Sequence, residues 1–125
     1  NLNTIKVDVA SKTKVHYDAD NFTTSIVNYK SKDGTEVPMY LTYKKGLNLK
    51  NNNPVILYGY GGFGVSTKPF FQFSNIIFFE NNGILAVPLI RGGGEFGKDW
   101  HEQGKLLNNQ NTFDDFIRKV HPYAK

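Results

Sequence analysis

The sequence contains no cysteine, and this absence excludes several kinds of chemistry. Without thiols the chain has no disulfide, no thiolate nucleophile and no cysteine-ligated zinc. The absence of cysteine does not decide between an oxidising and a reducing compartment. Its three histidines, His16, His101 and His121, are too scattered to predict a zinc site. Its apolar stretches are all shorter than the roughly 20 residues of a membrane-spanning helix. We therefore expect no metal, no cofactor and no membrane partner.

Runs of basic residues are also missing. The formal net charge is +4, and the lysines and arginines are dispersed. Because a nucleic-acid backbone is followed by clustered positive charges, we expect no nucleic-acid partner. The chain does not open with the basic, apolar and small-residue segments of a signal peptide, which favours a cytoplasmic location. Since it begins with Asn1, not Met, we expect a processed protein or a piece of a longer one.

The first part of the chain has the alternating pattern of β-hairpins. Residues 1–17 alternate weakly around a polar turn, and residues 18–23 have the composition of a linker. Two further alternating runs, 25–29 and 37–43, flank Asp33-Gly34. Because Asp-Gly tolerates positive φ, this pattern predicts a second hairpin.

The second part of the chain has an α/β order. Residues 55–58 and 84–90 are continuous apolar runs, which are typical of strands buried on both faces. Residues 70–79 and 111–121 fit amphipathic helices. In the first predicted helix, Phe70, Phe73 and Ile77 fit a helical stripe, and so do Phe71, Ser74 and Phe78. In the second, the predicted face consists of Phe113, Phe116, Ile117 and Val120. The order predicts an α/β sheet that continues beyond these residues.

A glycine-rich loop, residues 58–64, follows the first buried run. Its spacing satisfies G-x-G-x-x-G at Gly59, Gly61 and Gly64, which permits a dinucleotide-binding interpretation. Tyr60 and Phe63 would crowd a phosphate, no helix start follows directly, and Glu80 lies in the wrong element for the ribose. The alternative is a tight turn that needs positive φ.

A second glycine-rich loop, residues 91–97, follows the second buried run. In α/β proteins, sites lie at the carboxyl ends of sheet strands, where we expect both loops. Arg91 and Glu95 stand among the glycines of the second loop. We interpret them as an ion pair that pins a closely packed backbone.

Other polar residues give weaker signals. Ser66, Asp114 and His121 follow the order of a catalytic triad, but Ser66 is not in a Gly-x-Ser-x-Gly elbow. The neighbours His101 and Glu102 would point apart, so they make a poor acid–base pair. Asp114 and its neighbour Asp115 are interpreted as first-turn charges that favour a helix N-terminus.

Four ordered motifs resemble the prolyl oligopeptidase family. They are residues 31–39, residues 58–63, residues 90–97 running on to Trp100-His101, and residues 111–116. The resemblance covers roughly residues 25–118. It implies a serine peptidase that cuts short peptides, often after proline, and combines an α/β-hydrolase domain with a β-propeller. Residues 1–24 would then be the end of the propeller and a linker, and residues 25–125 an incomplete N-terminal part of the peptidase domain.

The resemblance also implies roles for single residues. Tyr60 would donate a hydrogen bond to the oxyanion, Phe63 would line the proline pocket, and Arg91 and Glu95 would support the loop beside the site. The nucleophilic Ser, the Asp and the His would all lie downstream of residue 116, so we expect these 125 residues alone to be inactive. The implied partners are a short peptide and the remainder of the peptidase domain and propeller.

Two alternatives remain open. A truncated α/β sheet with uncovered apolar faces can serve as a non-enzymatic interaction module. The glycine spacing of the first loop leaves a nucleotide-binding domain as a weaker alternative.

Overall fold

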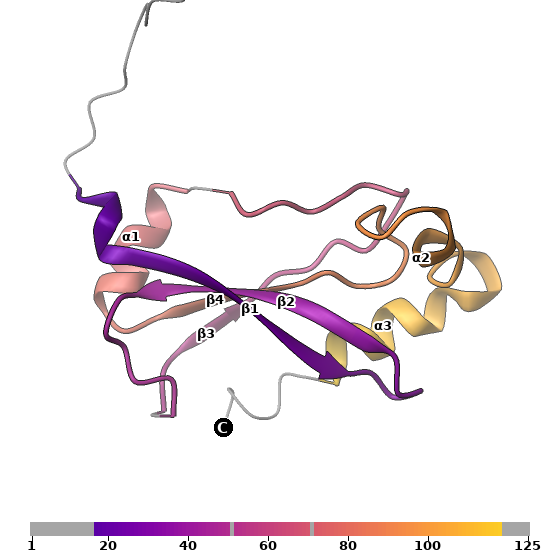
Figure 1. Ribbon diagram of the computed structural model, residues 1–125, viewed down its shortest axis with the longest axis horizontal. Helices are drawn as coiled ribbons and strands as arrows, with labels where there is room; N and C mark the ends of the chain where they lie inside the picture. Colours follow the sequence, from indigo (N-terminus) through magenta and orange to yellow (C-terminus); the bar gives the residue numbers. More distant parts are fainter. Residues whose placement is uncertain (1–16, 51, 71, 119–125) are drawn as a thin grey trace, which may run out of the picture.

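A four-stranded mixed sheet forms the centre of the molecule (Figure 1). The computed structural model describes residues 17–50, 52–70 and 72–118. The strands are β1 (Phe22–Lys30), β2 (Glu36–Lys44), β3 (Val55–Leu57) and β4 (Ile84–Pro88), in the spatial order β1-β2-β4-β3. β2 is antiparallel to both β1 and β4, whereas β3 and β4 are parallel.

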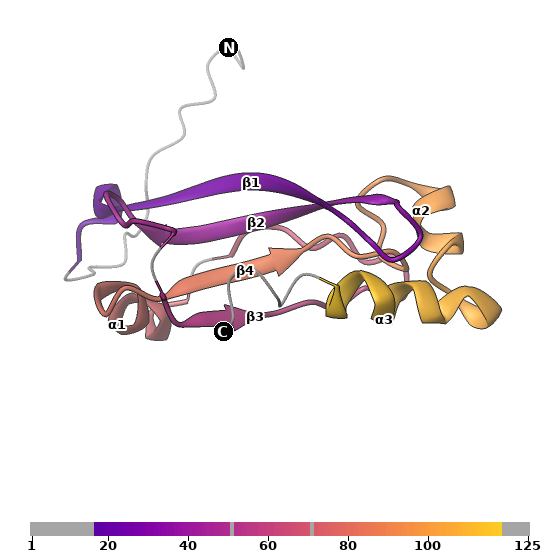
Figure 2. The same ribbon diagram turned by 90° about the horizontal axis from the view of Figure 1, so that it is seen from below.

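Helices lie at the two ends of this sheet. They are η1 (Ala19–Asn21), α1 (Ser74–Glu80), α2 (Lys98–Glu102), η2 (Leu106–Asn108) and α3 (Asn109–Ile117). α1 connects β3 to β4 and lies at their amino ends, while α2 and α3 lie beyond their carboxyl ends (Figures 1 and 2). The two glycine-rich loops therefore leave the sheet on the side of α2 and α3.

The hairpin predicted around Asp33-Gly34 is confirmed. β1 and β2 pair along their whole length, from Phe22 opposite Lys44 to Lys30 opposite Glu36. Gly34 has φ 89°, a conformation in which a side chain would be strained. β1 begins inside the stretch predicted as a linker, and the hairpin predicted over residues 1–17 lies, except for its last residue, outside the described residues.

The core has two clusters, one on each face of β4. The larger cluster consists of Tyr29, Val37, Met39, Leu41, Ile84, Ala86 and Ile90, and the smaller of Phe79, Leu85 and Val87. The prediction that the 84–90 strand is buried on both faces is therefore confirmed, although the strand ends at Pro88. The same prediction for β3 is wrong, because β3 is an edge strand and Ile56 is 44% exposed.

The predicted apolar faces of both helices also need correction. α1 begins only at Ser74 and packs on the sheet through Phe79 and Phe78, of which only Phe78 was predicted, while Ile77 is 71% exposed. α3 turns Thr112, Asp115 and Phe116 inward, as the spacing i, i+3, i+4 allows, and leaves Phe113 and Ile117 exposed. Val120, predicted for the same face, and Phe71, predicted for the first helix, lie outside the described residues.

Truncation of Leu41 tests this assignment of the core. Leu41→Ala should lower the free energy of unfolding by about 2–5 kcal/mol, because it leaves a cavity within the larger cluster. Ile26→Ala is the matched control on β1, where the side chain is exposed, and should change it by less than about 0.5 kcal/mol. Urea unfolding followed by circular dichroism measures both, and equal effects would contradict the assignment.

Candidate functional site

The two glycine-rich loops contact each other at the carboxyl ends of β3 and β4. Three hydrogen bonds join the second loop to the end of the first loop and the residues directly after it: Gly64 N–H to Gly92 O at 3.1 Å, Gly94 N–H to Val65 O at 3.2 Å, and Thr67 N–H to Glu95 Oε1 at 2.8 Å. The parallel pairing of β3 and β4 ends at Leu57 opposite Ala86, so these bonds join the chain beyond the paired strands. The loops therefore form one unit.

Close backbone approach explains the glycines. A Cβ atom on Gly92 would lie 2.3 Å from Gly61 O, and one on Gly94 would lie 2.1 Å from Gly64 O. In the first loop, a Cβ on Gly61 would lie 2.5 Å from Ile90. Gly61, Gly92 and Gly94 are thus required by contacts within the protein, which supports the interpretation of the first loop as a tight turn. The next helix, α1, starts only at Ser74.

Tyr60 and Phe63 are presented to solvent by the first loop. Tyr60 is 50% exposed, and its hydroxyl makes no hydrogen bond with the part of the chain that the structure describes. Phe63 is 89% exposed and has φ 52°, a left-handed conformation that is unusual for a bulky residue. Such strain costs on the order of 1–3 kcal/mol and clusters at functional sites.

Arg91 does not pair with Glu95, so that prediction is wrong. The guanidinium is 2% exposed and binds Asp115 with two bonds, Nε to Oδ2 at 2.9 Å and Nη2 to Oδ1 at 2.6 Å. Nη1 also donates to Asp33 Oδ2 at 2.6 Å. The side chain thus reaches α3 and the β1–β2 turn, and these contacts, led by the hydrogen bonds to Asp115, raise the pKa of Arg91.

Asp115 is the buried centre of a polar cluster that reaches the surface at Asp33. We call it the Arg91 cluster: Tyr29, Ser31, Asp33, Thr35, Arg91 and Asp115. The Asp115 carboxylate is fully buried and also accepts hydrogen bonds from Ser31 Oγ and from the Arg91 backbone N–H. Its backbone oxygen accepts from Tyr29 OH at 2.6 Å. Burial, reinforced by the charge of Asp115, raises the pKa of Tyr29 above its usual range.

The interpretation of Asp114 and Asp115 as first-turn charges is also wrong. α3 begins at Asn109, so both residues lie well inside the helix. Asp114 accepts a hydrogen bond from Gln110 at 3.0 Å and lies 3.9 Å from Lys32 Nζ. Asp115 lies on the inward face of α3, and a charged residue on such a face is the sequence feature from which a buried ion pair could have been predicted.

Glu95 and His101 both hold the loops together. Glu95 Oε1 accepts from Thr67, while its Oε2 is buried without a partner among the described residues. His101 Nδ1 lies 2.7 Å from Gly92 O. Glu102 instead pairs with Lys105 at 3.0 Å, which lowers the pKa of Glu102, so His101 and Glu102 are separately engaged.

The candidate triad is not assembled by any described contact. Ser66 lies beside Gly94, since its Oγ would be 3.1 Å from a Cβ there. Asp114 is engaged by Gln110 and Lys32, and His121 lies outside the described residues.

Among residues 17–50, 52–70 and 72–118, no group of three His, Asp or Glu side chains is placed to hold a metal ion. Within those same ranges, no helix is long and apolar enough to cross a membrane.

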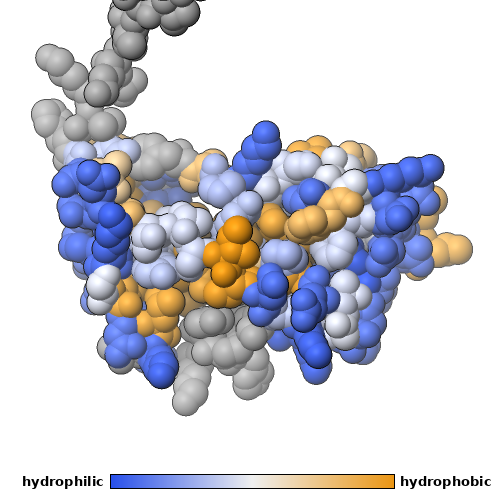
Figure 3. Space-filling view, in the orientation of Figure 1, coloured by the Kyte–Doolittle hydropathy of each residue, from blue (hydrophilic) through white to orange (hydrophobic). Residues whose placement is uncertain are grey.

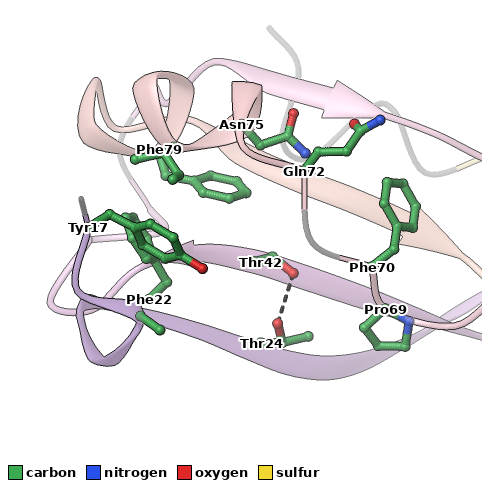
Figure 4. A pocket seen from close by; sticks show the side chains of 11 residues that line it. Tyr17, Phe22, Thr24, Thr42, Pro69, Phe70, Gln72, Asn75 and Phe79 are labelled. Atoms are coloured by element: carbon green, nitrogen blue, oxygen red, sulfur yellow. Dashed lines mark hydrogen bonds between the residues drawn. The ribbon is translucent and has the colours of Figure 1, made fainter. Parts of the chain in front are cut away.

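A cavity of about 250 Å³ lies elsewhere, between the β1–β2 hairpin and α1 (Figure 4). Aromatic rings of Tyr17, Phe22 and Phe79 gather on one side of it, and Phe70 lies on the other. The hydrogen-bonded pair Thr24 and Thr42 lies on the strands below. Neither Tyr60 nor Phe63 lines this cavity, so it is separate from the glycine loops.

The mixed sheet, with facing loops at the carboxyl ends of its parallel strands, places the chain among α/β proteins. Residues 69–125 match the sequence profile of the prolyl oligopeptidase family. A prolyl endopeptidase of Elizabethkingia meningoseptica is 49% identical over 117 residues, 94% of this chain and 17% of the relative. A dual function macrocyclase-peptidase of Amanita bisporigera is 46% identical over 116 residues, 91% of this chain and 16% of the relative.

Solved structures agree with these sequence matches. A post-proline cleaving enzyme from Rickettsia typhi superposes with a TM-score of 0.79 at 35% identity, over 88% of this chain and 16% of that one. Prolyl oligopeptidase B from Galerina marginata gives 0.79 at 46% identity, over 82% and 15%. The chain belongs to the prolyl oligopeptidase family of serine peptidases. It spans about one sixth of the length of the curated relatives that it matches.

Removal of the charge on Asp115 tests the Arg91 cluster. Asp115→Asn should lower the free energy of unfolding by about 3–5 kcal/mol, because the buried Arg91 guanidinium loses its main counter-charge. Asp114→Asn, the control one position earlier, should cost less than about 1 kcal/mol, since its ion pair is long and its partner Lys32 is exposed. Chemical unfolding measures both variants, and a near-neutral Asp115→Asn would contradict the cluster.

The Asp33 carboxylate predicts a specific acid dependence. The hydrogen bond from Arg91 lowers the pKa of Asp33 from 3.8 to about 2. A folded-state pKa below the unfolded value stabilises the fold above pH 3.8, and this contribution is lost as the pH falls through about 2. Asp33→Asn should therefore flatten the stability profile between those values. An unchanged slope in acid titrations would contradict the pairing of Asp33 with Arg91.

Proposed function

We propose that the chain is part of the catalytic domain of a serine-type oligopeptidase that hydrolyses short proline-containing peptides. The observation that carries this proposal is the hydrogen-bonded pair of glycine loops, which presents the strained Phe63 and a Tyr60 hydroxyl without a hydrogen bond to the described residues. Residues 25–125 would form the N-terminal part of an α/β-hydrolase sheet. Residues 1–24 would be the end of a β-propeller and a linker. The cytoplasmic location expected from the sequence remains a prediction.

The reaction would be acyl transfer. A Ser attacks the peptide carbonyl, a His removes its proton and returns it to the leaving amine, and an Asp orients the His. This chain has no Gly-x-Ser-x-Gly elbow, so the triad would be supplied by residues outside it. The chain itself would contribute the Tyr60 hydroxyl, which is free to donate to the oxyanion that develops on the carbonyl oxygen.

A peptide substrate is supported by the relatives. The prolyl oligopeptidase B of Galerina marginata has been solved with a 35-residue hydrolysis and macrocyclization substrate bound. This chain superposes on that complex with a TM-score of 0.75 at 46% identity. We extend the substrate class, a peptide, to the present protein. Phe63 would then contact the proline ring, because an exposed aromatic side chain beside the oxyanion donor offers an apolar wall.

The coding sequence around the chain tests the proposal. Sequencing the source gene past the codon for Lys125 should reveal a Gly-x-Ser-x-Gly motif, followed by an Asp and a His. The 125 residues alone should neither hydrolyse a chromogenic proline-containing peptide nor react with a fluorophosphonate. A gene without the elbow, or labelling of Ser66, would overturn this assignment of roles.

An interaction module is the second candidate, and exposed apolar side chains favour it. Leu107 is fully exposed, and its neighbour Leu106 is largely so. Figure 3 shows hydrophobic side chains near the middle of one face, flanked by hydrophilic ones. Large exposed apolar patches mark contact surfaces. A monodisperse 125-residue monomer with dispersed amide resonances would favour an autonomous module, whereas aggregation would favour part of a larger domain.

Tyr60→Phe tests the oxyanion role. In the full-length peptidase, loss of one such donor should lower kcat about 10²–10³-fold with little change in KM, because the bond strengthens only in the transition state. Tyr58→Phe is the matched control, since Tyr58 is similarly exposed but precedes the glycine turn. Steady-state kinetics on a proline-containing peptide measure both. An unaffected kcat in Tyr60→Phe would remove Tyr60 from the mechanism.

Phe63→Ala tests the pocket role. It should mainly raise KM, by about 10-fold or more, because the ring would contribute apolar contact to bound substrate and transition state alike. Phe113→Ala, an exposed phenylalanine on α3, serves as the control and should leave KM unchanged. The same kinetic assay separates the two parameters. A fall in kcat with constant KM would contradict a binding role for Phe63.

A further inference from the structure

Both backbone polar groups of Gly92 form contacts with helix α2. The Gly92 N–H donates to Trp100 O at 3.1 Å, and Gly92 O lies 2.7 Å from His101 Nδ1. The two contacts come from successive residues of α2. Gly92 has φ 96°, so its peptide groups have orientations that another residue would adopt only with strain. α2 therefore fixes the orientation of this carbonyl.

The same carbonyl oxygen also accepts a hydrogen bond from the first loop. Gly64 N–H donates to Gly92 O at 3.1 Å, so the oxygen accepts from both Gly64 and His101, which its two lone pairs permit. The imidazole also lies against the first loop, because a Cβ on Gly64 would be 3.7 Å from Nδ1. His101 is thus placed at the point where the two loops meet.

Backbone hydrogen bonds anchor both ends of the segment that carries Tyr60 and Phe63: the bond at this point, and the bond from the Tyr58 N–H to Ala86 O at 2.9 Å. Between these anchors, Gly59 and Gly61 pack closely on Phe116 and Ile90. Between the anchors, the Tyr60 hydroxyl has no hydrogen bond to any described residue, and Phe63 is almost fully exposed. The positions of both side chains therefore depend on the backbone between Tyr58 and Gly64, which the Gly92 carbonyl holds at its Gly64 end.

We propose that His101 is a positioning residue for Tyr60 and Phe63. A carbonyl oxygen only accepts, so the bond requires a proton on Nδ1 of His101. By donating that proton to Gly92 O, the imidazole holds the carbonyl in line with the Gly64 N–H and keeps the first loop in its strained conformation. We call this hydrogen bond from His101 Nδ1 to Gly92 O the latch. An effect of the latch on catalysis rests on the function proposed above for Tyr60 and Phe63, whereas the hydrogen bond itself does not.

The tautomer of His101 tests the latch in the unmodified protein. Long-range ¹H–¹⁵N correlation spectra of the 125-residue chain near neutral pH should show a protonated Nδ1 for His101. A ring protonated only on Nε2 would overturn the proposal, since Nδ1 would then face the carbonyl without a hydrogen.

Three variants test the effect on the first loop. His101→Leu removes the donor, His101→Asn places an amide N–H near the position of Nδ1, and Glu102→Gln alters the exposed neighbour. Amide exchange of Gly64 should rise about 10-fold in His101→Leu, the equilibrium equivalent of one hydrogen bond, and return towards the original rate in His101→Asn. Glu102→Gln should not change it. If His101→Leu does not fold, His101→Asn and the tautomer decide.

Amide exchange rates in the sheet distinguish a local effect of His101 on the loops from a general loss of stability. Amides of β1 and β2 should keep their exchange rates in His101→Leu, since the latch contacts only the loops. An equal rise at all amides, or no rise at Gly64, would overturn the proposal. In the full-length peptidase, His101→Leu should lower kcat about 10-fold, and His101→Asn should restore it. A kcat that does not depend on His101 would overturn the positioning role. Absence of turnover in the unmodified enzyme would instead reject the proposed function, and the tautomer and exchange measurements would then decide whether the latch exists.

Discussion

The buried ion pair between Arg91 and Asp115 is the interaction on which the arrangement of this chain depends. Burial of two charges costs several kcal/mol per ion unless hydrogen bonds compensate it. Here the carboxylate accepts from the guanidinium, a backbone N–H and the Ser31 hydroxyl. The guanidinium reaches Asp33 as well. The pair therefore ties together the β1–β2 turn, the second glycine loop and α3, three segments that are distant in the sequence.

The position of the candidate site follows from this pair. α3 buries little apolar surface, as Phe113 and Ile117 are exposed, so its polar contacts hold it in place. Once held, it packs Thr112 and Phe116 under the first glycine loop, where Cβ atoms on Gly61 and Gly59 would collide with them. Thr112 Oγ1 also donates to Arg91 O at 2.8 Å. The loop that presents Tyr60 is thus supported from below by a helix that the ion pair positions.

The sequence predicted the parts of the fold that depend on local chemistry. Asp33-Gly34 indicated the hairpin because positive φ is a local requirement, and the glycine loops indicated close backbone packing for the same reason. The partner of Arg91 could not be found in this way. Glu95 is near in sequence, but only the folded arrangement of α3 brings Asp115 to the guanidinium. The exposure of Ile56 depends on strand order, which the apolar run does not encode.

A double-mutant cycle between Arg91 and Asp115 tests the central claim most directly. The unfolding free energies of Arg91→Met, Asp115→Leu and the double variant would be compared with that of the unmodified chain. Arg91→Met leaves the buried Asp115 carboxylate without its counter-charge, and Asp115→Leu leaves the buried guanidinium with only the half-exposed Asp33 as an ionic partner. We therefore expect each single change to cost about 3–5 kcal/mol, and the double variant to be more stable than either. Additive costs, with no coupling between the two positions, would contradict the claim that this pair holds the three segments together.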